Sequence, residues 1–254
     1  MKRLDILAPV ALIAVILAIW QAACALWNVP EYLLPTPTAI GAALVSNAAM
    51  LAAAGWRTLS MALEALVVAS LLGGAMAILV TLNRALGQAI RPIAVAMQVT
   101  PVVAIAPLFI IWAGVQHPDR AIVALAAIVA FFPIFSGTVR GLTSADPDLE
   151  RLFDLYGARA GQRLVRLRIP AALPFVVEGH KVAAGLAIIG AVVAEFVAGS
   201  GGAQGLAWRI LEAGNRLRTA EMFAAILALA LMASVVHVLF QELEKRALTW
   251  WRGR

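Results

Sequence analysis

The chain is poor in the residues that build a soluble enzyme. Charged residues make up 13% of its 254 positions, against about a quarter in soluble domains, which excludes an ordinary water-soluble fold. A single cysteine allows no internal disulfide. His117, His180 and His237 lie far apart, without the spacing of metal ligands. The sequence has no Ser-His-Asp or paired-carboxylate arrangement and no GxxxxGK[ST] phosphate loop, so neither an enzyme nor an ATPase is indicated.

Apolar sequence is what the chain has in excess. Hydrophobic residues account for 63% of the chain and its mean hydropathy is +0.91. A helix needs about 20 apolar residues to cross a hydrocarbon layer of about 30 Å. Such runs predict six membrane helices, at 5–27, 56–82, 92–115, 120–141, 175–198 and 222–248. Because these runs lack the alternating polarity of barrel strands, we predict an all-α membrane protein with one domain, 1–254.

The first apolar run also has features of a signal peptide. Lys2 and Arg3 precede it, and Ala23-Cys24-Ala25 has the small-x-small form of a cleavage site. The run is too long for the apolar region of a signal peptide, and further apolar runs follow it. A retained membrane helix is therefore predicted.

Positive charge is unevenly distributed between the two sides that six spans define. With the amino terminus inside, 15 of the 20 Lys and Arg residues fall on the inner side and 5 on the outer side. The positive-inside rule then places both termini and the segment 143–174 in the cytoplasm. The pI of about 10.4 is explained by this topology and by attraction to anionic lipid, rather than by a nucleic-acid partner.

Prolines and carboxylates interrupt several of the predicted spans. Pro101 and Pro107 lie in the third span and Pro133 in the fourth, so these helices are predicted to be bent or broken, as pathway-lining helices often are. Kinks that serve only packing are the alternative. Glu64 and Glu195 are pathway or gate candidates, because an ionisable residue inside a membrane is costly. A structural hydrogen bond or ion pair is the alternative for each.

One polar segment, FDLYGARAGQRLVRLRIPAALP (153–174), interrupts the apolar sequence. Five arginines lie between positions 151 and 168, and each costs about 2.5 to 3.5 kcal/mol at the bilayer centre, so the segment must lie in water or at the headgroups. Asp146 and Pro147 are typical of a helix start, and Gly157 can end that helix in the left-handed conformation. A second short helix is predicted to follow, broken by Pro170 and Pro174.

The first of these two short helices has one apolar face. Leu149, Leu152, Phe153 and Tyr156 form it, at the spacing of a helical stripe. One interpretation is an amphipathic helix on lipid, whose neighbouring arginines meet phosphates. The other is a cytoplasmic helix that docks in a groove of a partner protein. The residues by themselves leave both open.

The spacing inside this segment resembles a motif of binding-protein-dependent ABC importer permeases. The motif reads EAA, three residues, Gly, nine residues, Ile-x-Leu-Pro. Gly157 is followed by nine residues and Leu167-Arg168-Ile169-Pro170, whereas Arg-Leu-Phe takes the place of EAA. Further stretches resemble the branch for nitrate, taurine, aliphatic sulfonates and pyrimidine precursors. They are LPTP (34–37), TPVVAIAPLFIIWAG (100–114), FFPIF (131–135), IPAALP (169–174) and VAEFVAGSGGAQGL (193–206).

The resemblance implies a transport subunit of an ATP-driven importer in the inner membrane. It implies a second permease copy in a homodimer, a cytoplasmic ATPase dimer that uses the ATP, and an external solute-binding protein, with no cofactor bound by this chain. A coupling helix between the fourth and fifth spans would dock the ATPase. The docking residues would be Leu149, Arg151, Leu152, Phe153, Asp154, Tyr156, Gly157 and Pro170. An ion-coupled secondary transporter that uses Glu64 or Glu195 is the alternative.

Overall fold

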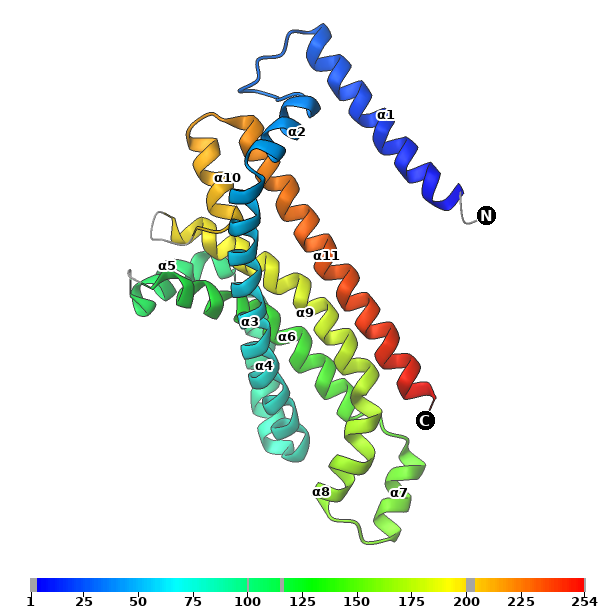
Figure 1. Ribbon diagram of the computed structural model, residues 1–254. Helices are drawn as coiled ribbons and strands as arrows, with labels where there is room; N and C mark the ends of the chain where they lie inside the picture. Colours follow the sequence, from blue (N-terminus) through cyan, green and yellow to red (C-terminus); the bar gives the residue numbers. More distant parts are fainter. Residues whose placement is uncertain (1–3, 100, 115–116, 200–203, 254) are drawn as a thin grey trace. The chain divides into compact units, whose positions relative to one another are not determined.

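The computed structural model describes residues 4–99, 101–114, 117–199 and 204–253, and all regular secondary structure in these ranges is helical (Figure 1). The prediction of an all-α membrane protein is confirmed. Within these ranges, five helical segments are long and apolar enough to cross a membrane. They are Leu7–Leu26, Ala48–Leu82, Pro118–Leu142, Ala160–Ala198 and Thr219–Trp251.

The remaining predicted span, 92–115, is not one continuous helix. The structure forms two shorter helices there, α4 (Arg84–Val99) and α5 (Val102–Ala113). Pro101, which has no N–H to donate, lies at the N-cap of α5. The predicted break is therefore confirmed at Pro101. No break is present at the other two prolines, since α5 continues past Pro107 and α6 (Pro118–Leu142) past Pro133, and a bend at either proline stays a prediction.

The chain divides into two compact units, and the first contains Met1–Arg57 and Gln204–Leu231. This unit includes α1 (Leu4–Leu26), α2 (Pro37–Ser46), α10 (Leu206–Asn215) and the first parts of α3 (Ala48–Leu82) and α11 (Thr219–Arg252). The Thr36 side chain caps α2 by accepting from the Ala39 N–H, and Pro37 takes the first helical position.

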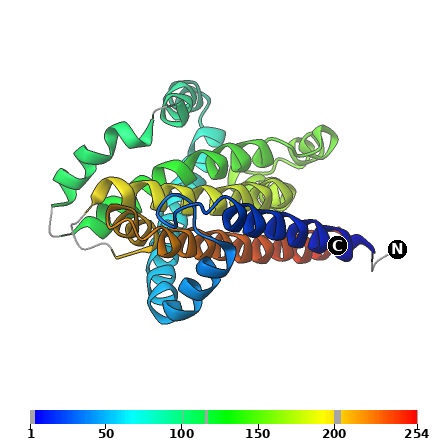
Figure 2. The ribbon, with the colours of Figure 1, turned by 90° about the horizontal axis from the view of Figure 1, so that it is seen from above.

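The second unit contains Thr58–Ala203 and Met232–Arg254, and its core is the contact between α6 and α9 (Ile169–Ala198). The two helices run side by side in the views of Figures 1 and 2. Glycines on both make this possible: a Cβ on Gly141 would lie 2.8 Å from Ala172 Cα, and one on Gly179 would lie 2.8 Å from Pro133 O. Small residues allow helices in membranes to pack with their backbones close together.

Three further contacts attach neighbouring helices to this core. Gly73 of α3 faces α6, since a Cβ there would lie 3.3 Å from Ile134 Cγ2. An ion pair that the sequence does not predict, Lys181 to Glu244 at 2.7 Å, joins α9 to the last part of α11. Trp251 adds a hydrogen bond from Nε1 to the Pro170 carbonyl at 2.8 Å. The end of α11 is thus held along the first turns of α9.

Candidate functional site

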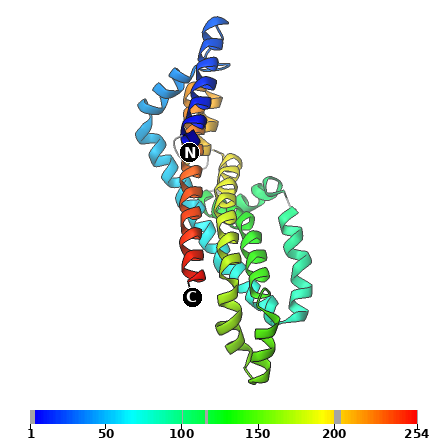
Figure 3. The same cartoon turned by 90° about the vertical axis from the view of Figure 1, so that its right-hand side faces the viewer.

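The polar segment between α6 and α9 forms a helical hairpin at the end of the second unit (Figure 3). Its first helix, α7 (Pro147–Leu155), begins as predicted: the Asp146 carboxylate accepts from the Asp148 N–H at 2.8 Å and Pro147 takes the first position. It is followed by Gly157 with φ of +64°, in the left-handed region that favours glycine. The predicted start and end of this helix are both confirmed.

The second half of the hairpin differs from the prediction. The short helix α8 (Ala160–Arg163) continues through a π turn, η1 (Leu164–Arg168), directly into α9. The expected break at Pro170 and Pro174 is therefore wrong. In the π turn the Ile169 N–H bonds to the Leu164 carbonyl, five residues back. This wider turn, together with the position of Pro170 in the first turn of α9, lets the helix accommodate a residue without an N–H.

Ion pairs connect the two halves of the hairpin. Glu150 of α7 lies 2.7 Å from Arg168 Nε and 3.5 Å from an Arg163 nitrogen, and Arg163 also contacts the Asp154 carboxylate. Glu150, Arg163 and Arg168 are about three-quarters buried. The sequence showed acidic residues before Gly157 and arginines after it, yet the pairing itself was not predicted. The pairing depends on the folded hairpin, which brings Glu150 next to arginines 13 and 18 residues later in the chain.

The opposite face of α7 is apolar and exposed. Leu155 and Tyr156 are 85% and 82% exposed, and Leu149 and Leu152 are nearly half exposed. Beside them lies a pocket of about 290 Å³. It is lined by Leu152, Phe153, Tyr156, Ala158, Gln162 and Arg166. The predicted apolar stripe is thus present and is widened by Leu155, and it is available for contact with another molecule.

Two predicted docking residues lie elsewhere. Arg151 is 78% exposed and pairs with Asp148 at 3.0 Å along α7 itself. Pro170 lies in the first turn of α9, where its carbonyl accepts from Trp251. The structure therefore separates Pro170 from the exposed apolar face of α7, and the docking role of all eight residues stays a prediction.

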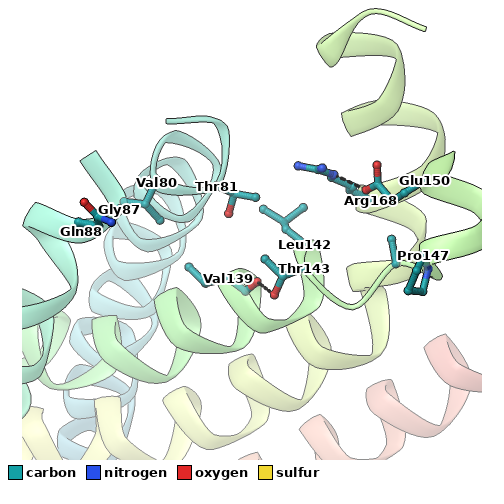
Figure 4. Close-up of a pocket in the computed structure, with 11 residues that line it drawn as sticks. Val80, Thr81, Gly87, Gln88, Val139, Leu142, Thr143, Pro147, Glu150 and Arg168 are labelled. Carbon is teal, nitrogen blue, oxygen red and sulfur yellow. Dashed lines mark hydrogen bonds and ion pairs between the residues drawn. The ribbon is translucent and has the colours of Figure 1, made fainter. Parts of the chain in front are cut away.

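A larger pocket, of about 720 Å³, lies next to the start of α7 (Figure 4). Its lining comes from the ends of α3 and α6, the first turns of α4 and the hairpin. The hydroxyls of Thr81 and Thr143 donate hydrogen bonds to backbone carbonyls of their own helices, at 2.7 and 2.9 Å. The pair of Glu150 and Arg168 borders the pocket. Among the described residues no group of three His, Cys, Asp or Glu side chains could hold a metal ion.

The two membrane glutamates have different surroundings. Glu195 of α9 is almost completely buried, and its Oε1 accepts from the Thr58 Oγ1 at 2.7 Å. This bond agrees with the structural alternative for Glu195. Glu64 of α3 is exposed, on the same helix face as Leu63, Val67 and Leu71. Within the described ranges it has neither a hydrogen-bond partner nor an ion-pair partner.

Comparison with known proteins agrees with this architecture. Residues 69–248 match the family described as binding-protein-dependent transport system inner membrane component. The chain is 31% identical to the formylaminopyrimidine transport permease protein ThiX of Halalkalibacterium halodurans, over 98% of each chain. It is 35% identical to the riboflavin transport system permease protein RibX of Chloroflexus aurantiacus, over 95% of this chain and 89% of that one. A putative aliphatic sulfonates transport permease protein, SsuC of Bacillus subtilis, is 27% identical over 98% of this chain and 89% of its own length.

These matches identify a multi-pass transport subunit rather than an ion-coupled secondary transporter, so that alternative is wrong. The family implies an ATPase and a solute-binding protein as partners in general. Part of the VAEFVAGSGGAQGL stretch, 200–203, lies outside the described residues, as does Thr100. The chain belongs to the family of binding-protein-dependent transport system inner membrane components, as a permease subunit of an ABC importer in the branch that includes the taurine and aliphatic sulfonate permeases.

Proposed function

We propose that two copies of this chain form the translocation pathway in the inner membrane, and that each presents α7 to one subunit of a cytoplasmic ATPase dimer. The observation that carries this proposal is the exposed apolar face of α7, in a segment too rich in arginine to enter the bilayer. ATP is bound by the ATPases, and this chain binds no cofactor. The outer side receives the solute-binding protein, lipid surrounds the spans, and no nucleic acid is involved.

The packing supports a rigid-body mechanism. When the ATPases close around ATP, they draw the two α7 helices together. Because α8, η1 and α9 form one uninterrupted helical segment, Ala160–Ala198, this displacement reaches the membrane through α9. The close glycine contacts between α6 and α9 then make both helices move as one body. The pathway alternates between inward-open and outward-open states.

Labelling of introduced cysteines tests the orientation. A cysteine at exposed Arg159 (Arg159→Cys) is expected to react with a membrane-impermeant maleimide only from the cytoplasmic side, since the positive-inside rule places the hairpin there. A cysteine at exposed Arg216 is expected to react only from outside. Reaction of Arg159→Cys from outside in sealed cells would reverse the proposed topology. Cys24 is buried and serves as the background in both variants.

Glu64 is proposed to line the pathway. A carboxylate that faced lipid near the bilayer centre would cost about 2.5 to 3.5 kcal/mol on the insertion scale, so water is the more favourable neighbour for this exposed side chain. In the same labelling experiment Glu64→Cys should therefore react with the water-soluble reagent. Leu71→Cys on the same face, about two turns further along α3, reports whether the reactive zone extends along the helix.

A negative charge on the pathway disfavours anionic solutes. Two relatives above 30% identity are named for formylaminopyrimidine and riboflavin, which are heterocycles, whereas the sulfonate relative is 27% identical. Together with Glu64, these names support a neutral nitrogen heterocycle as the solute of this importer rather than a sulfonate or nitrate.

Uptake measurements test the solute. Vesicles that contain the permease, its ATPase and its binding protein are expected to accumulate formylaminopyrimidine in the presence of ATP, at a rate at least about tenfold above that of taurine, which corresponds to a discrimination of about 1.4 kcal/mol. Faster uptake of taurine would contradict the heterocycle proposal but leave the importer intact. ATP-independent uptake of either solute would contradict the proposed ATP-driven mechanism.

A further inference from the structure

The hairpin contains a clamp whose parts are distant in sequence. Glu150 is the only described residue of α7 that contacts both Arg163 at the end of α8 and Arg168 at the end of the π turn. Its side chain is 22% exposed, as is that of Arg163, and that of Arg168 is 26% exposed. Removing one partner from a partly buried ion pair destabilises a protein more than removing one from an exposed pair, because the remaining charge is left incompletely solvated.

The π turn explains how both arginines reach one carboxylate. Residues 163 and 168 are five positions apart, which in a regular α-helix directs them about 140° away from each other. In a π turn the bonding partner is five residues away, so residues at this spacing lie roughly one turn apart on the same face. The Ile169 N–H to Leu164 carbonyl bond is of this type. The wider turn therefore aligns Arg163 and Arg168 along the side that faces Glu150.

The clamp connects the two helices that the proposed mechanism needs to move together. Along the chain, α7 is joined to α8 by the turn around Gly157, where nothing lies within 4 Å of the position that a Cβ would take. The pocket of about 720 Å³ lies beside Glu150 and Arg168, so packing on that side is open (Figure 4). Without the clamp, α7 could tilt on its turn while α9 stayed in place.

We infer that Glu150 is a positioning residue for ATP-driven transport. It pairs with Arg163 and Arg168, which the π turn brings to one side of the helix, and these ion pairs make α7 and α9 move together as one rigid body. This inference rests on the proposed docking of the ATPase at α7. It assigns to Glu150 a role inside the permease, and it leaves contact with the ATPase to the opposite, apolar face of α7.

The test uses the permease in complex with its ATPase, with ATP plus vanadate as the probe, so no solute is required. A reporter cysteine replaces Phe196, which is 39% exposed near the far end of α9, and its labelling rate is compared with and without the probe. Phe196 is 28 residues beyond Arg168, about 42 Å along a helix, so a local disturbance at the hairpin does not reach it directly.

Glu150→Gln is expected to retain the ATPase and to hydrolyse ATP, but to reduce the nucleotide-dependent change in labelling about tenfold, within the usual range of coupling factors. Asp148→Asn is the matched control, since it neutralises an acid of the same helix whose pair with Arg151 is exposed (84% and 78%). This control should respond like the parent complex. The double exchange Glu150→Arg with Arg168→Glu should restore part of the response, because it re-forms the pair with position 168 in reverse but leaves Arg163 beside a like charge.

Three outcomes would overturn the inference. They are a full labelling response in Glu150→Gln, loss of the ATPase from that variant, which would place Glu150 in the docking contact, and failure of the double exchange to recover any response. A parent complex that binds no ATPase would instead overturn the proposed function, and with it this inference. ATPase binding by the unmutated permease therefore distinguishes failure of the proposed function from failure of this inference.

Discussion

Replacing Gly157 with valine is expected to weaken binding of the ATPase at least tenfold while the protein still inserts in the membrane. Gly157 has φ of +64°, and an L-residue in the left-handed region costs about 1 to 2 kcal/mol, with β-branched residues at the upper end. Each 1.4 kcal/mol corresponds to about a tenfold change in an equilibrium constant. The strain would be relieved by unwinding the turn between α7 and α8, which would reorient the apolar face of α7.

The cause in this variant is backbone conformation rather than crowding, because no atom lies within 4 Å of a Cβ at position 157. Gly161→Ala is the matched control: it lies four residues further, inside α8, and its Cβ also meets nothing within 4 Å. Alanine favours a helix by comparison with glycine, so this control should bind the ATPase as well as the parent does. Recovery of ATPase with tagged permease measures both. Equal recovery for Gly157→Val would show that docking does not depend on the turn.

Replacing Gly179 with valine is expected to remove most of the folded protein from the membrane. A Cβ at this position would lie 2.8 Å from the Pro133 carbonyl oxygen and 3.6 Å from Gly137 Cα, both of which belong to the backbone of α6. Backbone atoms cannot rotate away as a flexible side chain can, so α6 and α9 must separate. Overpacking of a close contact costs about 1 to 3 kcal/mol or more, a large part of the stability of a domain.

Gly185→Val on the same helix is the control for this prediction. Gly185 is exposed and a Cβ there meets nothing within 4 Å, so the added side chain has room within this chain. The thermal unfolding midpoint in detergent and the amount of folded permease in the membrane should both fall for Gly179→Val and stay near the parent values for Gly185→Val. Similar midpoints for the two variants would mean that the α6 and α9 contact is not the centre of stability.

In the helical hairpin, the features that the sequence predicts correctly are those that depend on neighbouring residues alone. Asp146, Pro147 and Gly157 each act through the backbone next to them, by capping, by a fixed φ and by tolerance of a positive φ. Their effects are local, so the start and end of α7 were predicted correctly. Pro170 was misjudged because its missing N–H is compensated by a π turn, and whether a helix continues or breaks at a proline depends on such adjustments.

The different surroundings of Glu64 and Glu195 could not be predicted from the residues next to them in the chain. Glu64 and Glu195 look alike in sequence, as single carboxylates in apolar helices. The structure buries Glu195 against Thr58, which lies 137 residues earlier in the chain, and leaves Glu64 exposed. The glycine contacts of α6 and α9 could have been anticipated in part, because Gly137 and Gly141 have the small-xxx-small spacing of membrane helix contacts. Their partners on α9 could not.

The sequence by itself determined that this protein is an all-helical membrane protein, where five of its six predicted spans lie and which family the chain resembles, and it predicts that the arginine-rich hairpin stays out of the bilayer. These properties follow from hydropathy, charge and backbone preference, which act over one or two helical turns or over the width of the membrane. Only the tertiary structure decided which charges pair, which helices touch through glycine and which face of α7 is free. Those features join residues far apart in the chain, so they exist only once the helices have packed.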